Sequence, residues 1–128
     1  MAKLPDPVQM TMREQLLARL TPNERANIEY HRAHLRNQTF YKDPATGNIT
    51  TFYGMTTRLP DGRFATVPSY LGEGKFAKTE EEALAHANKI GLKYPIYKSE
   101  KEALTAEKRV HDVMQMDTDH FLRAGWFE

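Results

Sequence analysis

The chain has 128 residues, of which 18 are Lys or Arg and 17 are Asp or Glu, so its formal net charge is +1. That length fits one domain with a modest core, and the balanced charge gives no global field that would draw the protein to nucleic acid or an anionic membrane. Cysteine is absent, which excludes disulfides, thiolate metal sites and cysteine nucleophiles.

Two helices are predicted at the start of the chain. The pair Asp6–Pro7 is a typical helix start, and apolar side chains then recur at helical spacing over residues 7–20. A second start follows at Thr21, which opens a capping box with proline in the first turn. This second helix is expected to end near Arg36. Residues 1–38 are therefore interpreted as an N-terminal helical segment.

The period of the sequence changes after this segment. Residues 39–42 and 49–57 are rich in aromatic and β-branched side chains, and the stretch between them has turn composition. The dipeptide Asp61–Gly62 is a strong hairpin signal, and the strand after it should stop at Pro68 because proline cannot donate within a ladder. We expect a three-stranded antiparallel meander, followed by a flexible loop over residues 71–75.

One short pattern occurs twice in the last third of the chain. Residues 79–84 read Thr-Glu-Glu-Glu-Ala-Leu, and residues 99–104 read Ser-Glu-Lys-Glu-Ala-Leu, so each copy is a capping box that starts a helix. Between them, Gly91 suits a left-handed helix stop and Pro95 blocks continuation. The closing helix is expected to run to about Arg123.

The order of these elements predicts an α+β fold. It comprises two N-terminal helices, a small antiparallel β-meander and two C-terminal helices, with the helices laid on one face of the sheet. Residues 39–128 would form the meander and two-helix module, and together with residues 1–38 they would make one structural domain. A chain that is extended outside this module is the alternative.

His31 and His34 form the first candidate site. They stand three positions apart in the second predicted helix, a spacing at which two imidazoles can face one metal ion. Only Glu24 and Glu29 are near enough in sequence to add a ligand, and neither completes a known zinc pattern. We therefore predict a solvated helix face and no metal or cofactor.

A second cluster of acids and imidazoles lies near the end of the closing helix. Catalysis by these groups would need them to converge on one pocket. Successive positions on a helix point in different directions, so the cluster is predicted to be solvated and the protein to be no enzyme. Its members are His111, Asp112, Asp117, Asp119 and His120.

Large apolar side chains that a partner could cover lie in the N-terminal helices, in the Tyr-Pro connector and at the C-terminal end. Aromatic residues are favoured anchors at protein interfaces. For the connector and the terminal pair, packing against the protein's own domain is the alternative. The candidate interface residues are Leu16, Tyr30, Tyr94, Tyr97, Trp126 and Phe127.

A mildly basic face is predicted on the second helix, between Arg25 and Arg36. It could contact phosphates as nucleic-acid-binding proteins do. Glu24 and Glu29 dilute its charge, however, and no aromatic RNA-binding motif or recognition-helix pattern accompanies it.

Four fragments in a fixed order resemble a short module found in proteins of tailed bacteriophages. Residues 61–69 read D-G-R-x-x-x-V-P-S, residues 81–83 read Glu-Glu-Ala, Tyr94 precedes Pro95, and a second Glu-Ala helix follows. The resemblance covers about residues 52–117 and leaves the N-terminal helices outside. Proteins with such modules are commonly virion components, and the resemblance implies no catalytic residues.

The sequence thus predicts a non-enzymatic structural protein of a tailed bacteriophage virion. It would bind copies of itself or a larger head, neck or tail component, and would be found in the virion and, during assembly, in the host cytoplasm. No run of about eighteen apolar residues is present, so no membrane span is expected. The alternative is a small nucleic-acid-binding or host-modulating phage protein that uses the Arg25–Arg36 face.

Overall fold

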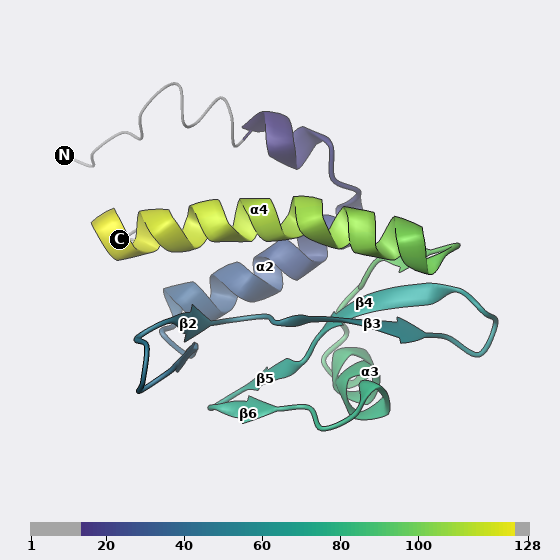
Figure 1. The fold of residues 1–128 in the computed structure, drawn as a ribbon, viewed down its shortest axis with the longest axis horizontal. Coiled ribbons are helices and arrows are strands. Elements are labelled where there is room, and N and C mark those ends of the chain that lie inside the picture. The colour runs from purple at the N-terminus through teal and green to yellow at the C-terminus, as the bar shows by residue number, and fades with distance from the viewer. Residues whose placement is uncertain (1–13, 125–128) are drawn as a thin grey trace.

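The computed structural model describes residues 14–124 and has the mixed helical and strand content of an α+β fold (Figure 1). Residues 14–18 are helical. The elements that follow, in chain order, are α2 (Pro22–Arg36), β1 (Tyr41–Lys42), β2 (Ile49–Thr50), β3 (Gly54–Arg58), β4 (Phe64–Pro68), β5 (Tyr70–Gly72), β6 (Lys75–Phe76), α3 (Glu80–Lys89), β7 (Ile96–Tyr97) and α4 (Glu100–Ala124). Within the described residues no helix combines the length and apolarity that crossing a bilayer requires.

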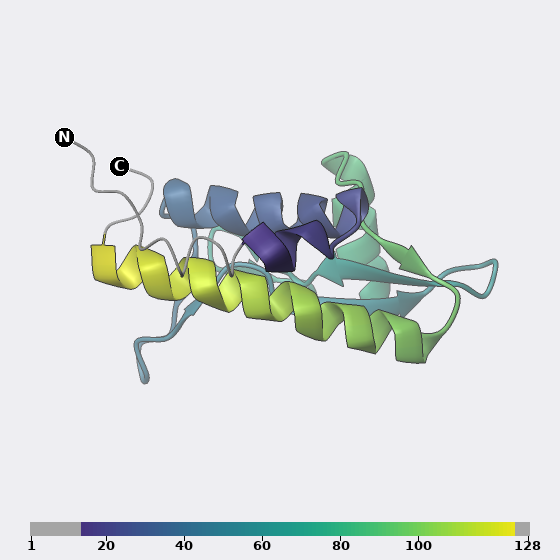
Figure 2. The ribbon, with the colours of Figure 1, turned by 90° about the horizontal axis from the view of Figure 1, so that it is seen from above.

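Helices α2 and α4 lie side by side and run in the same direction (Figure 2). Two ion pairs between described residues join them, and the pair that lies later in α2 also lies later in α4. Arg109 Nη2 lies 3.9 Å from Glu24 Oε2, and about two turns further along both helices Arg32 Nε lies 3.1 Å from Asp117 Oδ2. The apolar contact beside these pairs is formed by Leu20, Ile28, Phe52, Val110, Val113 and Met114.

The central sheet has the order β3-β4-β7, with both pairings antiparallel. Helix α3 packs on one face, where Ala83 and Ala87 are buried with Val67. Helices α2 and α4 cover the other face (Figure 1). The expectation that all helices lie on one face was therefore wrong. Alternate residues of β4 face opposite sides, and both sides carry small or apolar residues that a helix can cover.

The composition of the sheet also differs from the expected meander. Its third strand is β7, which follows the Tyr-Pro connector, and it pairs through Phe64↔Tyr97 and Ala65↔Ile96. Strand β1 pairs only with β2, in a separate two-stranded sheet. The expected flexible loop at residues 71–75 belongs to the β5–β6 hairpin, whose tight turn is possible because Gly72 and Gly74 both adopt positive φ.

The predicted helix starts are confirmed at Thr21, Thr79 and Ser99. Their side-chain oxygens accept from the third backbone amide of each helix, at 3.2, 3.1 and 3.1 Å. Only the box at Thr21 is reciprocal. At the other two starts the glutamate accepts from the amide before the cap, from Lys78 and Lys98. The helix start predicted at Asp6–Pro7 lies outside the described residues.

Candidate functional site

Polar side chains line the side of α2 that faces α4 and the sheet. Glu24, Asn27 and His31 are spaced for one helix face, and only 1%, 0% and 2% of each residue is exposed. Burial of polar groups is costly unless they are hydrogen-bonded. The partners of these three side chains therefore determine how α2, α4 and the sheet fit together. We call Glu24, Asn27 and His31 the polar layer.

Glu24 and Asn27 are held by specific hydrogen bonds. The hydroxyl of Tyr97 on β7 donates to Glu24 Oε2 at 2.5 Å, and the Thr21 amide donates to Glu24 Oε1 at 2.9 Å. Burial, reinforced by the neighbouring Glu24 carboxylate, raises the pKa of Tyr97 well above its usual range. Asn27 Nδ2 donates to the carbonyl of Thr66 on β4 at 3.1 Å. These bonds fix α2 to the strands beneath it.

His31 is the third member of the polar layer. Its Nδ1 is hydrogen-bonded to Thr51 Oγ1. Burial lowers the pKa of His31 from 6.5 to about 4, and the Met114 carbonyl opposes this shift only in part. The ring is therefore neutral near pH 7 and adds no charge to the interior.

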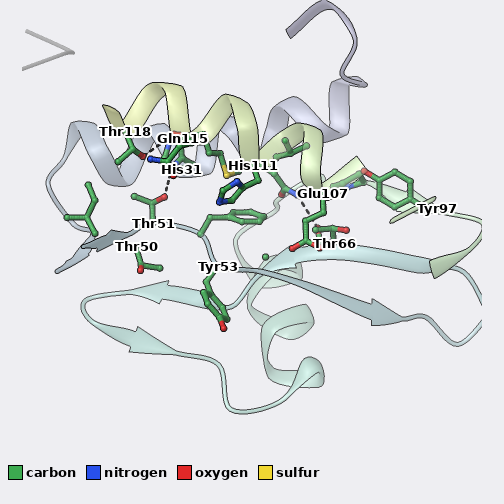
Figure 3. A pocket seen from close by; sticks show the side chains of 17 residues that line it. His31, Thr50, Thr51, Tyr53, Thr66, Tyr97, Glu107, His111, Gln115 and Thr118 are labelled. Carbon is green, nitrogen blue, oxygen red and sulfur yellow. Dashed lines mark hydrogen bonds between the residues drawn. The ribbon is translucent and has the colours of Figure 1, made fainter. Parts of the chain in front are cut away.

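A cavity of about 190 Å³ lies beside the polar layer (Figure 3). Residues 49–54 form one wall, and side chains of α4 from Glu107 to Thr118 form the other. The two walls run in opposite directions, because Thr50 lies at the same end as Thr118 whereas Gly54 lies beside Glu107 at the other. Thr66 also lies at the Glu107 end. Asn27 and His31 belong to the lining, so the cavity borders the polar layer directly.

Glu107 carries the negative charge of this cavity. Its carboxylate is half-buried, and no hydrogen bond or ion pair joins it to another side chain or backbone group of residues 14–124. Burial raises its pKa, and nearby His111 partly opposes that shift. Gly54 makes room for the carboxylate, since a Cβ at this position would lie 2.6 Å from Glu107 Oε1.

His31 and His34 were expected to lie on a solvated helix face, and this was wrong for His31, which is buried and has a different partner from His34. His31 bonds to Thr51, whereas His34 Nδ1 is 2.7 Å from Thr39 Oγ1. In the part of the chain that the structure describes, no group of three or more His, Asp or Glu side chains is placed to hold a metal ion.

The cluster near the end of α4 does not converge on one point, but the expectation that it is solvated was wrong for Asp117. Asp117 is buried against Arg32 of α2, whereas Asp119 accepts from Gln115 Nε2 at 2.9 Å on the exposed side. Only His111 of this cluster lines the cavity.

Four of the predicted interface residues make contacts within the fold. Leu16 and Tyr30 pack against the apolar core, and the Tyr30 hydroxyl donates to the Tyr70 carbonyl at 2.5 Å. Burial raises the pKa of Tyr30 to about 12. The Tyr94 hydroxyl donates to Asn88 Oδ1 at 2.9 Å. The fourth residue, Tyr97, is bound to Glu24.

The other two predicted interface residues, Trp126 and Phe127, lie outside the described residues. A role for any of the six in binding a partner stays a prediction.

The basic face of α2 is partly engaged inside the protein. Arg25 Nη2 donates to the Leu17 carbonyl at 2.9 Å, and Arg32 reaches the buried Asp117. Two of the arginines expected to contact phosphates thus already have partners in the fold.

Sequence reasoning missed Glu107, Asn27 and Thr66 as site residues. Polar residues on helices, such as Glu107 and Asn27, are usually solvated, and nothing local distinguishes these two, or Thr66 on β4, from their neighbours. Gly54 offered one signal, because a glycine within a strand often marks the close approach of another group.

No family model, curated protein sequence or solved structure matches the chain. Its function must therefore be argued from the geometry above and from the sequence resemblance.

Proposed function

We propose that the protein is a non-enzymatic structural component of a tailed bacteriophage virion. It binds copies of itself or a larger head, neck or tail component during assembly. One observation carries this proposal. The four fragments of the phage-like module are separated in the sequence, but they pack against one another as a unit.

The contacts of this unit use the residues that define the fragments. The hairpin supplies Val67, which is buried against Ala83 of the Glu-Glu-Ala helix. The Tyr-Pro connector supplies Pro95, whose carbonyl accepts from the Thr66 amide at 3.2 Å, and leads into β7. Helix α4, the second Glu-Ala helix, buries Ala103 and Ala106. A sequence pattern explained by packing supports a role as a structural module.

The polar groups of the site also support a non-enzymatic role. Thr51 and His31 are hydrogen-bonded as a nucleophile and base would be, but both are buried. Glu107 and His111 are four positions apart on α4, and apart from the buried Thr51–His31 pair no hydroxyl hydrogen-bonded to a histidine joins them in the described cavity lining. The site is suited to binding.

Exposed aromatic side chains offer a contact surface for assembly. Tyr53 and Phe76 are 70% and 38% exposed, and their rings meet edge to face with centroids 6.5 Å apart. Tyr53 adopts φ of 49°, a conformation that costs a non-glycine residue about 1–3 kcal/mol and that is found most often at functional sites. We place one assembly contact at this pair.

Mass spectrometry of purified particles tests the proposal, using the phage that encodes the protein. The protein should be present at a defined copy number after the particles are freed of host proteins. Its complete absence from the particles would overturn the proposal.

Replacement of both Tyr53 and Phe76 by Ser tests the contact surface. The double variant should fold and should be incorporated into particles at a reduced level. Ile90→Ser, which removes another exposed apolar side chain on a different part of the surface, is the matched control and should be incorporated normally.

A further inference from the structure

We propose that the cavity between α4 and residues 49–54 binds a cationic group on an apolar stem, that is, a primary ammonium or a guanidinium. The source is either a free alkyl diamine or the side chain of a Lys or Arg from another protein. This inference does not depend on the virion role, because it follows from the charge, the hydrogen-bonding groups and the size of the cavity.

The charge of the lining favours a cation. Glu107 is the acidic residue of the lining, and no Lys or Arg is among the residues that form the walls. His31 is neutral near pH 7 because burial lowers its pKa to about 4. A half-buried carboxylate with no ion-pair partner is unfavourable, and an incoming cation would relieve that cost. An anionic ligand would be repelled by the Glu107 carboxylate.

The hydrogen-bonding groups at the same end of the cavity favour a ligand that donates. Asn27 and Thr66 line it there, and both are more than nine-tenths buried. Asn27 Oδ1 and Thr66 Oγ1 have no hydrogen-bond partner in the described structure. Buried acceptors without partners are uncommon in folded proteins. An ammonium offers three donors and a guanidinium five, with no acceptor on either group.

The remaining lining favours an apolar stem. Phe52, Pro95, Val110 and Met114 contribute apolar side chains to the same lining. The volume of about 190 Å³ is below the roughly 300 Å³ at which sites for drug-sized ligands begin. A single long side chain or a short diamine suits this space. Lys and Arg likewise place an apolar stem beside a charged head.

Glu107→Gln is the variant that tests the site. It removes the charge while keeping the shape, and it should fold because the structure does not favour the ionised carboxyl. Asp112→Asn is the matched control, since it removes one exposed carboxylate from the same helix outside the cavity. Gly54→Ala is a second, independent variant, because its added methyl group would crowd both Glu107 Oε1 and Phe52 Cε1.

Binding is measured by NMR titration of the full-length protein with 1,5-diaminopentane, N-acetyl-lysine methylamide and N-acetyl-arginine methylamide. N-acetyl-norleucine methylamide is the neutral control. At least one cation should give saturable shifts confined to the cavity lining. Glu107→Gln and Gly54→Ala should weaken binding by about tenfold or more, and Asp112→Asn should not.

Tighter binding of the diamine would assign the site to a free diamine, whereas tighter binding of an amino-acid amide would assign it to a partner's side chain. The inference is overturned if no cation binds at millimolar concentration, or if the norleucine control binds equally well. It is also overturned if Asp112→Asn weakens binding as much as Glu107→Gln.

Discussion

The two faces of the central sheet are covered in different ways. On one face, α3 buries small apolar side chains, Ala83 and Ala87, against Val67. On the other face, α2 buries Glu24, Asn27 and His31 toward α4 and the strands. The first contact depends mainly on matching shapes, whereas the second depends on hydrogen-bond partners for its polar groups.

The two faces therefore differ in what positions their helices and in whether a ligand-binding cavity lies beside them. The apolar face is stabilised chiefly by the packing of its side chains, with a directional bond to α3 that Thr57 Oγ1 donates to Glu80 Oε2 at 3.4 Å. The polar layer sets the position of α2 through directional bonds to Thr66 and Tyr97. It also borders the cavity in whose lining Glu107 is the acidic residue. The predictions below change each face in turn.

The largest expected effect is at the buried ion pair between α2 and α4. Asp117→Ala removes the buried carboxylate and leaves the Arg32 guanidinium with the exposed Glu29, 3.4 Å away, so it should lower the free energy of unfolding by about 3 kcal/mol. Urea denaturation checks this value. Asp119→Ala, on the exposed side of the same helix, should change it by less than about 0.5 kcal/mol. Equal effects of the two substitutions would contradict the importance of the ion pair.

The pH dependence of stability should report on His31. Burial lowers its folded-state pKa from 6.5 to about 4, so between these values the unfolded chain binds a proton that the folded protein does not. Stability should therefore fall as the pH falls from 6.5 to 4, and this residue should contribute about 3 kcal/mol of the loss.

Unfolding of the wild type and His31→Gln is compared at pH 7 and at pH 4.5 for this purpose. In His31→Gln, the free energy of unfolding should differ much less between pH 7 and pH 4.5 than it does in the wild type. His111→Gln, at an exposed position of α4, should keep it. An unchanged pH dependence in His31→Gln would show that other groups cause the fall.

The apolar face should be sensitive to added volume. Ala87 is fully buried against the sheet, so Ala87→Leu should destabilise the protein by about 1–3 kcal/mol through overpacking. Ala85, two positions earlier, is exposed, and Ala85→Leu should change stability by less than about 0.5 kcal/mol. Thermal unfolding of the two variants distinguishes these outcomes, and similar values would contradict the assigned orientation of α3.

The smallest expected effect is at the start of α2. Thr21→Ala removes the oxygen that accepts from the Glu24 amide and should cost about 1 kcal/mol. Thr21→Asn, which keeps a capping oxygen, should recover most of that loss. Failure of the Asn variant to recover it, as measured by chemical denaturation, would mean that the cap contributes little.

These features differ in how far the sequence predicts them. The helix starts were predictable because a cap and its partner lie within one turn of each other. The third strand was not, since the pairing of Ile96–Tyr97 with β4 depends on how the chain returns to the sheet after α3. The position of residues 41–42 was missed for a similar reason, because hairpin signals do not say which sheet a strand joins.

The cavity was not predictable because its character arises from residues that are distant in sequence. Glu107 resembles any solvated glutamate on a helix until Gly54 is placed beside it. Asn27 resembles a surface residue, and its burial follows from the way α2 lies on the sheet beside α4. Local patterns report the faces of single elements, but a site of this kind depends on how three elements meet.

The proposed binding role of Glu107 comes at a cost to the stability of the fold. The most direct test compares the free energy of unfolding of the wild type, Glu107→Gln and Asp112→Asn at neutral pH without ligand. A raised carboxyl pKa means that ionisation disfavours the folded state, so stability is lost as the pH rises through that pKa. Glu107→Gln should therefore be more stable than the wild type. Asp112→Asn, the control, should be as stable as the wild type. A Glu107→Gln protein that is less stable than the wild type would contradict the claim.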